Sequence, residues 1–473
     1  PFNLLVFFFN SAFANQLVIL LMVLKLSFAA AFMSVLICER KPGKNGIWPV
    51  VFSVCYSFSS FAITFLFNII WLDGYLLLPL LLFLIERFIV NKKTLGIWIT
   101  LVVLFVSNYY IAYMVGIFSF FYLVVRLIEN DAFKEAKQAM KQLGKFILVA
   151  VLSALSVSAL LLPVGIDTIK NADVTSQAGG VNLVSFSLID IVDQLFCGST
   201  MDFSDLANNL PIVFCGIIVT LFIVMYFVSS EFKGRIRKIR AICMIAIYFI
   251  FAIFYLDITM QAFDMPNWFN HRYSFVFVPF FILIAYEVFK KIKTISRQDI
   301  YKSFGIVLVL LFVAQSFGEM KDDDAVFITN FLVLVAYFLL ILGLQKQKWP
   351  NQLRNMPKIV PFIMILIILF EIVGMNTKLS SQFSTYYGGC EADAYSESVL
   401  AIDEFTESVD NTDYGHRFEV EASTIWDDNY YAEDGYSQYC DFNGITTFDS
   451  SSNKAMVRFL KQLGYMVNYN YFA

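Results

Sequence analysis

Hydrophobic and polar positions alternate along this chain on the scale of a membrane span. Apolar runs close to the ~20 residues that cross a bilayer recur over most of the chain, separated by short polar or aromatic connections. We therefore expect residues 1–375 to be mostly α, a polytopic transmembrane helix bundle. About twelve spans are predicted, over residues 16–38, 48–67, 73–90, 95–110, 111–127, 146–165, 210–229, 241–257, 273–289, 304–317, 326–344 and 358–375.

Residues 95–127 form one long apolar run, which can be interpreted as one helix or as two. Basic residues distinguish these interpretations, because Lys and Arg concentrate in the cytoplasmic loops of membrane proteins. With a break near 107–110, alternate connections hold 25 Lys and Arg, and the intervening ones hold only Lys170, Arg272 and Lys321. A single helix would move every later basic loop to the outside. The charge pattern therefore predicts two spans, with both ends of the chain outside the cytoplasm.

The composition excludes several classes of protein. Hydrophobic residues make up 59% of the chain and charged residues 15%, whereas a soluble domain has about 25% charged residues. A soluble enzyme, a nucleic-acid-binding module and a disordered protein are therefore excluded. The chain enters an apolar run directly at Pro1 without a basic n-region, so we expect an N-terminally truncated sequence rather than a signal peptide.

Two segments depart from the apolar pattern. Residues 376–473 hold sixteen Asp and Glu against five Lys and Arg, and their alternating stretches predict a small extracytoplasmic α+β domain. The connection 166–209 includes an amphipathic stretch at 184–196, for which we expect a helix lying in the membrane interface.

Cysteine and histidine usage argues against a structural metal site. The chain has 2 His and no Cys-x-x-Cys spacing, so zinc is not expected. Cys197, Cys390 and Cys440 are predicted to face outward. Cys390 and Cys440 would either form a disulfide in an oxidising compartment or remain surface thiols.

Polar and aromatic side chains gather at the predicted outer ends of the spans, in the turns 68–74, 107–114 and 257–273. Polar groups at membrane depth are costly and often mark a function. The candidate substrate-binding residues are Trp71, Asn108, Tyr109, Tyr110, Tyr113, Asn267, Trp268, His271 and Arg272, joined by Lys25 within the first span.

Each of these groups also has a structural interpretation. The aromatic side chains could form an interfacial belt, and Arg272 could anchor to lipid phosphate. Asp73 could simply cap the third span. Glu86 and Glu287 lie near basic residues, where we expect surface ion pairs.

The outer surface suits a sugar carried on a polyprenyl phosphate. Arg272, with His271, could bind the phosphate, while aromatic faces and Asn side chains suit the sugar ring. Asp73 is the candidate general base for an acceptor hydroxyl. Because a lipid phosphate is already a competent leaving group, neither a cofactor nor a metal is expected.

Several short strings of the sequence are distinctive. They are 1–5 (PFNLL), 67–73 (FNIIWLD), 107–114 (SNYYIAYM), 266–275 (PNWFNHRYSF), 442–451 (FNGITTFDSS) and 459–465 (FLKQLGY). In these strings the chain resembles the bacterial YfhO family of polytopic proteins, which have the architecture of GT-C glycosyltransferases. Lys25 also falls where the family pattern carries a lysine.

The resemblance implies transfer of a sugar from an undecaprenyl-phosphate-linked donor to a cell-wall polymer, such as teichoic acid, on the outer face of a bacterial cell membrane. It makes Arg272 the phosphate contact, and Trp71, Asn108, Tyr109 and Tyr110 cavity groups. GT-C enzymes carry their catalytic acid in the first external loop. That loop would precede the start of this chain, so Asp73 is only a substitute candidate, and His271 stands where the family often has Tyr.

The sequence is compatible with two other functions. A transporter or flippase of lipid-linked sugar would continue the polar groups along a central path, for which Lys25 is the main indication. A non-catalytic wall-associated protein would act through residues 376–473. In every case the partners include the lipid bilayer and no nucleic acid.

Overall fold

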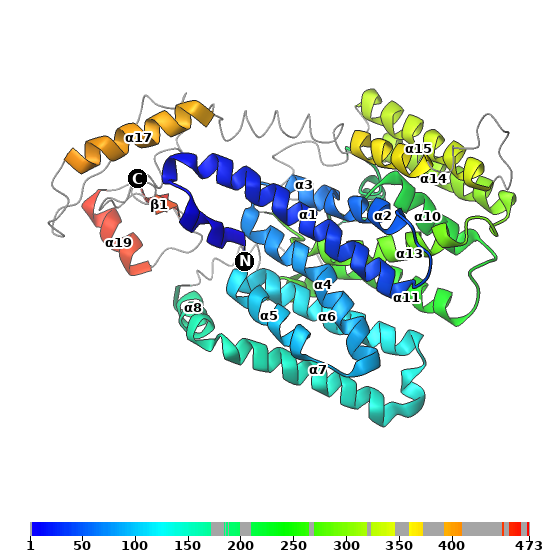
Figure 1. Cartoon of the computed structure of the whole chain (residues 1–473), viewed down its shortest axis with the longest axis horizontal. Helices are drawn as coiled ribbons and strands as arrows, with labels where there is room; N and C mark the ends of the chain where they lie inside the picture. Colours follow the sequence, from blue (N-terminus) through cyan, green and yellow to red (C-terminus); the bar gives the residue numbers. More distant parts are fainter. Residues whose placement is uncertain are drawn as a thin grey trace. The chain divides into compact units, whose positions relative to one another are not determined.

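The computed structural model is mostly helical (Figure 1). It describes residues 2–171, 184, 186–187, 189–198, 210–263, 269–318, 323–345, 359–371, 392–408, 447–448, 454–464 and 471–472. Strands β1 (Thr447–Phe448) and β2 (Tyr471–Phe472) form a short antiparallel pair.

In the first part of the chain the helices overlap the predicted apolar runs, although the runs 48–67 and 146–165 are each divided between two helices. They are η1 (Phe2–Phe8), η2 (Ser11–Phe13), α1 (Ala14–Arg40), α2 (Trp48–Ser57), α3 (Ser60–Thr64), α4 (Ile69–Asn91), α5 (Leu95–Ser107), α6 (Tyr109–Glu129), η3 (Ala132–Glu135), α7 (Ala136–Ser156) and α8 (Ser158–Asn171). The later ones are α9 (Asp190–Asp193), α10 (Ile217–Val228), α11 (Arg235–Ala252), α12 (Phe254–Met260), η5 (Ser274–Phe277), α13 (Val278–Lys290), α14 (Arg297–Phe317), α15 (Asp324–Gln345), α17 (Ala392–Ser408) and α19 (Lys454–Leu463), with a further helix at Ile359–Glu371.

The chain divides into two compact units. Unit 1 comprises Pro1–Leu21, Ser158–Gly179 and Ser380–Ala473, and unit 2 comprises Met22–Val157 and Gly180–Leu379. Within unit 1, the side chains of Tyr395 and Ser396 on α17 donate hydrogen bonds to the carbonyls of Ser11 and Ala12. All the candidate site residues belong to unit 2.

Six helices among the described residues are long and apolar enough to cross a membrane. They are Ser11–Arg40, Ile69–Asn91, Tyr109–Glu129, Ala132–Ser156, Arg297–Phe317 and Asp324–Gln345. Shorter apolar helices lie at Trp48–Ser57, Leu95–Ser107, Ile217–Val228 and Ile359–Glu371. The helical membrane-spanning character of the chain agrees with the sequence pattern, and the number of twelve spans stays a prediction.

Unit 2 is built around two groups of neighbouring helices (Figure 1). In one group α5 packs against α4, α6 and α7, and α4 also packs against α6. In the other, α10 packs against α13, α14 and α15. Stacked Tyr56 and Tyr75, whose ring centroids are 4.4 Å apart, join α2 to α4, and each tyrosine hydroxyl donates to the other's carbonyl.

The predicted break within 95–127 is confirmed. α5 ends at Ser107 and α6 begins at Tyr109, with Asn108 between them in an extended conformation (φ −164°, ψ 103°). The Asn108 side chain accepts a hydrogen bond from the Ile111 amide at 2.9 Å, which satisfies one of the free amides at the start of α6. The two helices then pack against each other.

Several other predicted spans are interrupted rather than continuous. The run 48–67 forms α2 and α3, and 241–257 is divided between α11 and α12 at Ile253, whose backbone is extended. Within 210–229 only Ile217–Val228 is helical. The length of a hydrophobic run does not predict the break at Ile253, because the residues on both sides of it are apolar. The break between α2 and α3 is accompanied only by serines, at 57, 59 and 60, which are common within membrane helices as well.

The connection before α10 also differs from the prediction. Instead of an interfacial helix over 184–196, the described residues contain only the short α9, followed by the fully buried Phe196. Cys197, predicted to face outward, is 5% exposed, and its thiol donates to the Glu371 carbonyl at 3.0 Å. Asn330 bonds both the amide and the carbonyl of Cys197, so this segment is held in the interior of unit 2. Cys390 and Cys440 lie outside the described residues.

Candidate functional site

Arg272 lies against two aromatic rings that come from separate connections. Its Cζ atom is 5.2 Å from the centroid of Trp71 at the start of α4, and 5.7 Å from that of Tyr110 at the start of α6. Both distances are in the range of a cation–π interaction. The Nε of Arg272 donates to the Phe269 carbonyl at 3.1 Å. We call Arg272, Trp71, Tyr110 and Phe269 the Arg272 site.

An aromatic cluster packs against Trp71 and Phe269 of this site. The ring of Trp71 meets Phe269 edge-on at 5.9 Å and Phe65 at 5.0 Å. Phe67 also contacts Phe269, at 5.9 Å. Trp71 is 6% exposed, so one face of the guanidinium rests on a ring whose position is fixed by packing. Such a ring contributes more to binding than a mobile one, because less conformational freedom is lost.

The backbone before Arg272 adopts a conformation that side chains seldom take. Phe269 has φ +59° and His271 has φ +54°, in the left-handed region where residues other than glycine are uncommon. Such a conformation persists only where surrounding contacts hold it. Here His271 and Tyr273, on either side of Arg272, are anchored below the surface, and this sets the direction of the arginine.

The anchor for both neighbours is Asp257 on α12. His271 Nδ1 lies 2.8 Å from Asp257 Oδ1, and the Tyr273 hydroxyl donates to the same oxygen at 2.8 Å. Gln261 Nε2 donates to Asp257 Oδ2 at 3.0 Å. Since a carboxylate only accepts, Nδ1 of His271 carries a hydrogen and donates. This network is buried, with His271 5% exposed, so His271 positions the loop rather than presenting its ring to the surface.

Lys25 and Asp73 form a buried ion pair. Lys25 Nζ lies 3.1 Å from Asp73 Oδ2 and donates to the Ile69 carbonyl at 2.8 Å. The two side chains are almost completely buried. Asp73 as a general base therefore stays a prediction, and it would require the lysine and its surroundings to move before an acceptor hydroxyl could reach the carboxylate.

The remaining predicted site residues have different environments. Asn108 caps α6, Tyr109 is 44% exposed, and the Tyr113 hydroxyl donates to the Thr259 carbonyl at 2.9 Å. Asn267 and Trp268 lie outside the described residues. The structure thus places Trp71 and Tyr110 against Arg272, with Asn108 two residues from Tyr110.

A second polar cluster, which the sequence did not predict, lies where the basic connections begin. Buried carboxylates there are shared among arginines of different helices. We call this cluster the arginine network; its members are Arg40, Glu86, Arg126, Glu129, Arg240 and Glu287.

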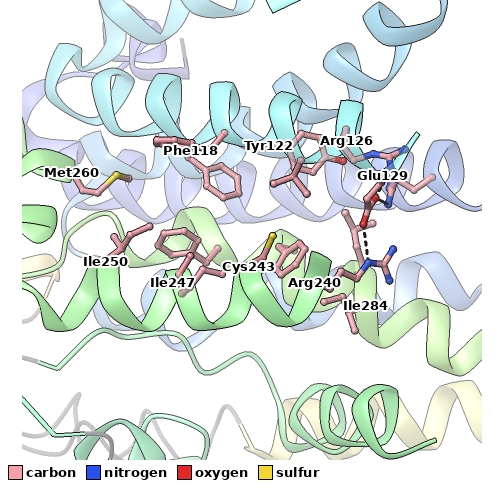
Figure 2. Close-up of a pocket in the computed structure, with 17 residues that line it drawn as sticks. Phe118, Tyr122, Arg126, Glu129, Arg240, Cys243, Ile247, Ile250, Met260 and Ile284 are labelled. Atoms are coloured by element: carbon pink, nitrogen blue, oxygen red, sulfur yellow. Dashed lines mark hydrogen bonds and ion pairs between the residues drawn. The ribbon is translucent and has the colours of Figure 1, made fainter. Parts of the chain in front are cut away.

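The carboxylates of the network have several partners each. Arg126 is bidentate to Glu86, at 2.6 and 3.0 Å. Glu129 lies 2.5 Å from Arg126 and 2.9 Å from Arg240; Figure 2 shows the Glu129–Arg240 bond. Glu287 pairs with Arg240 at 3.0 Å.

The prediction of surface ion pairs for Glu86 and Glu287 was therefore wrong. The Glu86 side chain is 9% exposed and that of Glu287 is 16% exposed. Their partners come from distant parts of the chain, so local spacing carries no signal for this burial. The only indication in the sequence is that an acidic residue lies near an arginine at the end of several spans.

Comparison with known proteins identifies the family. The family model described as bacterial membrane protein YfhO matches residues 1–473, the whole chain. The chain belongs to the YfhO family. No curated protein and no solved structure matches it significantly. As a YfhO-family chain with several apolar helices, it is a multi-pass membrane protein in contact with the lipid bilayer.

Proposed function

We propose that this protein is a glycosyltransferase that takes a sugar from a polyprenyl-phosphate donor and passes it to a cell-wall polymer, such as teichoic acid, at the outer face of the cell membrane. The observation that carries the proposal is Arg272, with its guanidinium over the rings of Trp71 and Tyr110. A lipid-borne phosphate needs a cation at the membrane edge, and a planar guanidinium binds phosphate with two parallel hydrogen bonds.

The position of the site supports a substrate anchored in the bilayer. Trp71 is near the start of α4, and Glu86 of the arginine network is near its end, so about 22 Å of helix separates the two clusters. The positive-inside pattern predicts that the network end is cytoplasmic. The Arg272 site is then at the outer edge of the bundle, where the phosphate of an outer-leaflet lipid would lie.

In the proposed reaction an acceptor hydroxyl attacks the anomeric carbon of the sugar. A new carbon–oxygen bond forms there, the bond from that carbon to the phosphate oxygen breaks, and the lipid phosphate leaves with the electron pair. Arg272 stabilises the charge that develops on the leaving phosphate, and the aromatic rings accommodate the sugar. The hydroxyl proton passes to a carboxylate base, for which Asp73 remains the candidate within this chain.

The test is transfer by the full-length protein in vesicles supplied with labelled polyprenyl-phosphate sugar and acceptor polymer. Arg272→Gln should lower kcat/KM about a hundredfold, as loss of one charge-stabilising group does, and Arg272→Lys should lower it less. The matched control is Arg87→Gln, which changes a 56% exposed arginine near the other end of α4 and should leave transfer unchanged. No transfer by the wild type, or full transfer by Arg272→Gln, would refute the proposal.

The same vesicle experiment distinguishes this proposal from the two other functions, transport of lipid-linked sugar and a non-catalytic role at the cell wall. Counterflow of lipid-linked sugar without transfer would favour a transporter, although the amine of Lys25, its main indication, is engaged by Asp73 and Ile69. If deletion of 376–473 abolished wall attachment while Arg272→Gln had no effect, a non-catalytic role would be favoured.

A further inference from the structure

A largely apolar crevice extends from the arginine network into unit 2, between α6, α11 and α13. Its volume is about 220 Å³. Figure 2 shows Phe118 and Tyr122 of α6 facing Ile247 and Ile250 of α11 across it. Arg40, Arg126, Glu129 and Arg240 form one end, and Met260 lies at the other.

The crevice exists because α11 lies away from the rest of unit 2 along most of its length. Within α11 only Arg240, Phe251 and Ala252 are buried. Between these anchors, side chains such as Ala246 remain exposed, and Phe121 across the opening is 53% exposed. In a bilayer these exposed apolar side chains would face lipid, so the crevice opens sideways into the hydrocarbon region.

The dimensions match one leaflet. From Arg240 to Ile250, α11 rises about 15 Å, which is half of the ~30 Å hydrocarbon thickness of a typical bilayer. The polar end therefore lies at the level of one set of head groups, and the apolar end lies near the bilayer midplane. An acyl chain that entered from that leaflet would extend along the whole crevice.

The charge at the polar end favours an anion. Three arginines, Arg40, Arg126 and Arg240, line this end with one carboxylate, that of Glu129. The other two carboxylates of the network, Glu86 and Glu287, pair with the same arginines from outside the lining, and Lys41 beside them adds a fourth cation. Over this whole group the cations outnumber the carboxylates by one. Among the residues that the structure describes, the buried Nε of Arg40 has no hydrogen-bond partner, and Arg40 makes only long contacts, 3.7 Å to Glu86 and 3.5 Å to Glu129.

We infer that this crevice binds an anionic phospholipid of the leaflet at the basic end, with one acyl chain between α6 and α11 and the phosphate at Arg40. Basic pockets between transmembrane helices on the cytoplasmic side bind anionic head groups in this way. The site is distinct from the Arg272 site, which lies at the other end of the bundle and belongs to the proposed transfer reaction. The bound lipid would hold α11 against α6.

The experiment measures retention of defined lipids by the full chain. Purified protein is delipidated in detergent, incubated with dioleoyl phosphatidylglycerol or dioleoyl phosphatidylcholine, and examined by native mass spectrometry. We expect the wild type to retain phosphatidylglycerol with about a tenfold preference over phosphatidylcholine. Both lipids carry the phosphate, but only phosphatidylglycerol has a net negative charge, because the choline ammonium compensates the phosphate of the other and is repelled by the basic end of the crevice. Equal retention of both lipids would overturn the inference.

A substitution that fills the crevice with a large side chain tests whether the lipid binds there. Ala246→Trp places a large ring in the crevice and should abolish retention of phosphatidylglycerol. The control is Ile245→Trp, at a 57% exposed position turned by about 100° around the helix, which should retain the lipid as the wild type does. Retention by Ala246→Trp equal to that of the wild type would refute the site. A dimer that Ala246→Trp dissociates, with no lipid retained by the wild type, would instead make the crevice an interface between copies.

A charge variant tests the head-group contact. Arg40→Gln should lose the preference for phosphatidylglycerol, and Arg87→Gln, at an exposed arginine, should keep it. If Arg40→Gln unfolded, its spectrum would show no lipid of either kind, and Ala246→Trp with its control would still decide the inference. An unchanged preference in folded Arg40→Gln would contradict it.

Discussion

At the scale of single residues, the charged groups within unit 2 are fixed by specific partners. Lys25 reaches from α1 to the Asp73 carboxylate and the Ile69 carbonyl at the start of α4. Removing two charges from water is costly, and the cost is offset only if each group finds a partner with good geometry. The lysine therefore joins two helices, where the sequence had suggested a polar path.

Replacing Lys25 by methionine is expected to lower the free energy of unfolding by about 3 kcal/mol, because the buried Asp73 would lose the cation beside it. Thermal unfolding of purified protein in detergent measures the change. The double variant Lys25→Met, Asp73→Leu should recover part of the loss, since both charges are then absent. A Lys25→Met protein as stable as the wild type would show that the pair contributes nothing.

At the scale of elements, the arginine network connects helices that are far apart in the sequence. Glu129 at the end of α6 contacts Arg40 of α1 and Arg240 of α11. Arg240 in turn reaches Glu287 of α13. Helix packing between apolar faces in a bilayer gains little from the hydrophobic effect, so polar contacts of this kind contribute to helix association.

Glu129→Gln is expected to destabilise the protein by about 3 kcal/mol, since three buried guanidinium groups lose a charged partner. The matched control is Glu39→Gln, which breaks the more exposed Arg87 pair (3.5 Å) and should cost at most about 1 kcal/mol. Both changes are read from the melting temperature in the same detergent. Equal effects of the two substitutions would show that burial of the network adds no stability.

At the scale of the whole molecule, the two polar clusters of unit 2 differ in chemistry. The Arg272 site combines one arginine with aromatic rings, while the arginine network combines several arginines with carboxylates. Because the two lie at opposite ends of α4, a bilayer around unit 2 would place them at opposite surfaces. The orientation of unit 2 in the bilayer then decides which of the two clusters is exposed to a substrate on the outer face of the membrane.

Thiol labelling in intact cells tests the orientation. In a chain whose seven native cysteines are replaced by alanine, Phe67→Cys should react with a membrane-impermeant reagent, because it lies near the Arg272 site. Lys134→Cys, at a 79% exposed side chain between α6 and α7, should react only after permeabilisation. The reverse pattern would place the Arg272 site in the cytoplasm and exclude an outer-face transferase.

The sequence alone determined the helical, multi-pass character of the chain and the break at Asn108. These features depend only on the length of apolar runs and on the alternation of basic loops along the chain, both of which can be read without a fold. It also indicated three of the connections that carry the candidate site, because polar residues at the ends of apolar runs are visible without a fold.

Only the tertiary structure decided which of those residues meet. The contact of Arg272 with Trp71 and Tyr110, the anchoring of its neighbours by Asp257 and the burial of Cys197 depend on which helix faces pack together. The same holds for the arginine network, whose first and last members in the sequence, Arg40 and Glu287, lie 247 positions apart. The periodicity of the sequence cannot predict pairing between residues so far apart. A charged side chain is buried only where the fold brings a partner to it.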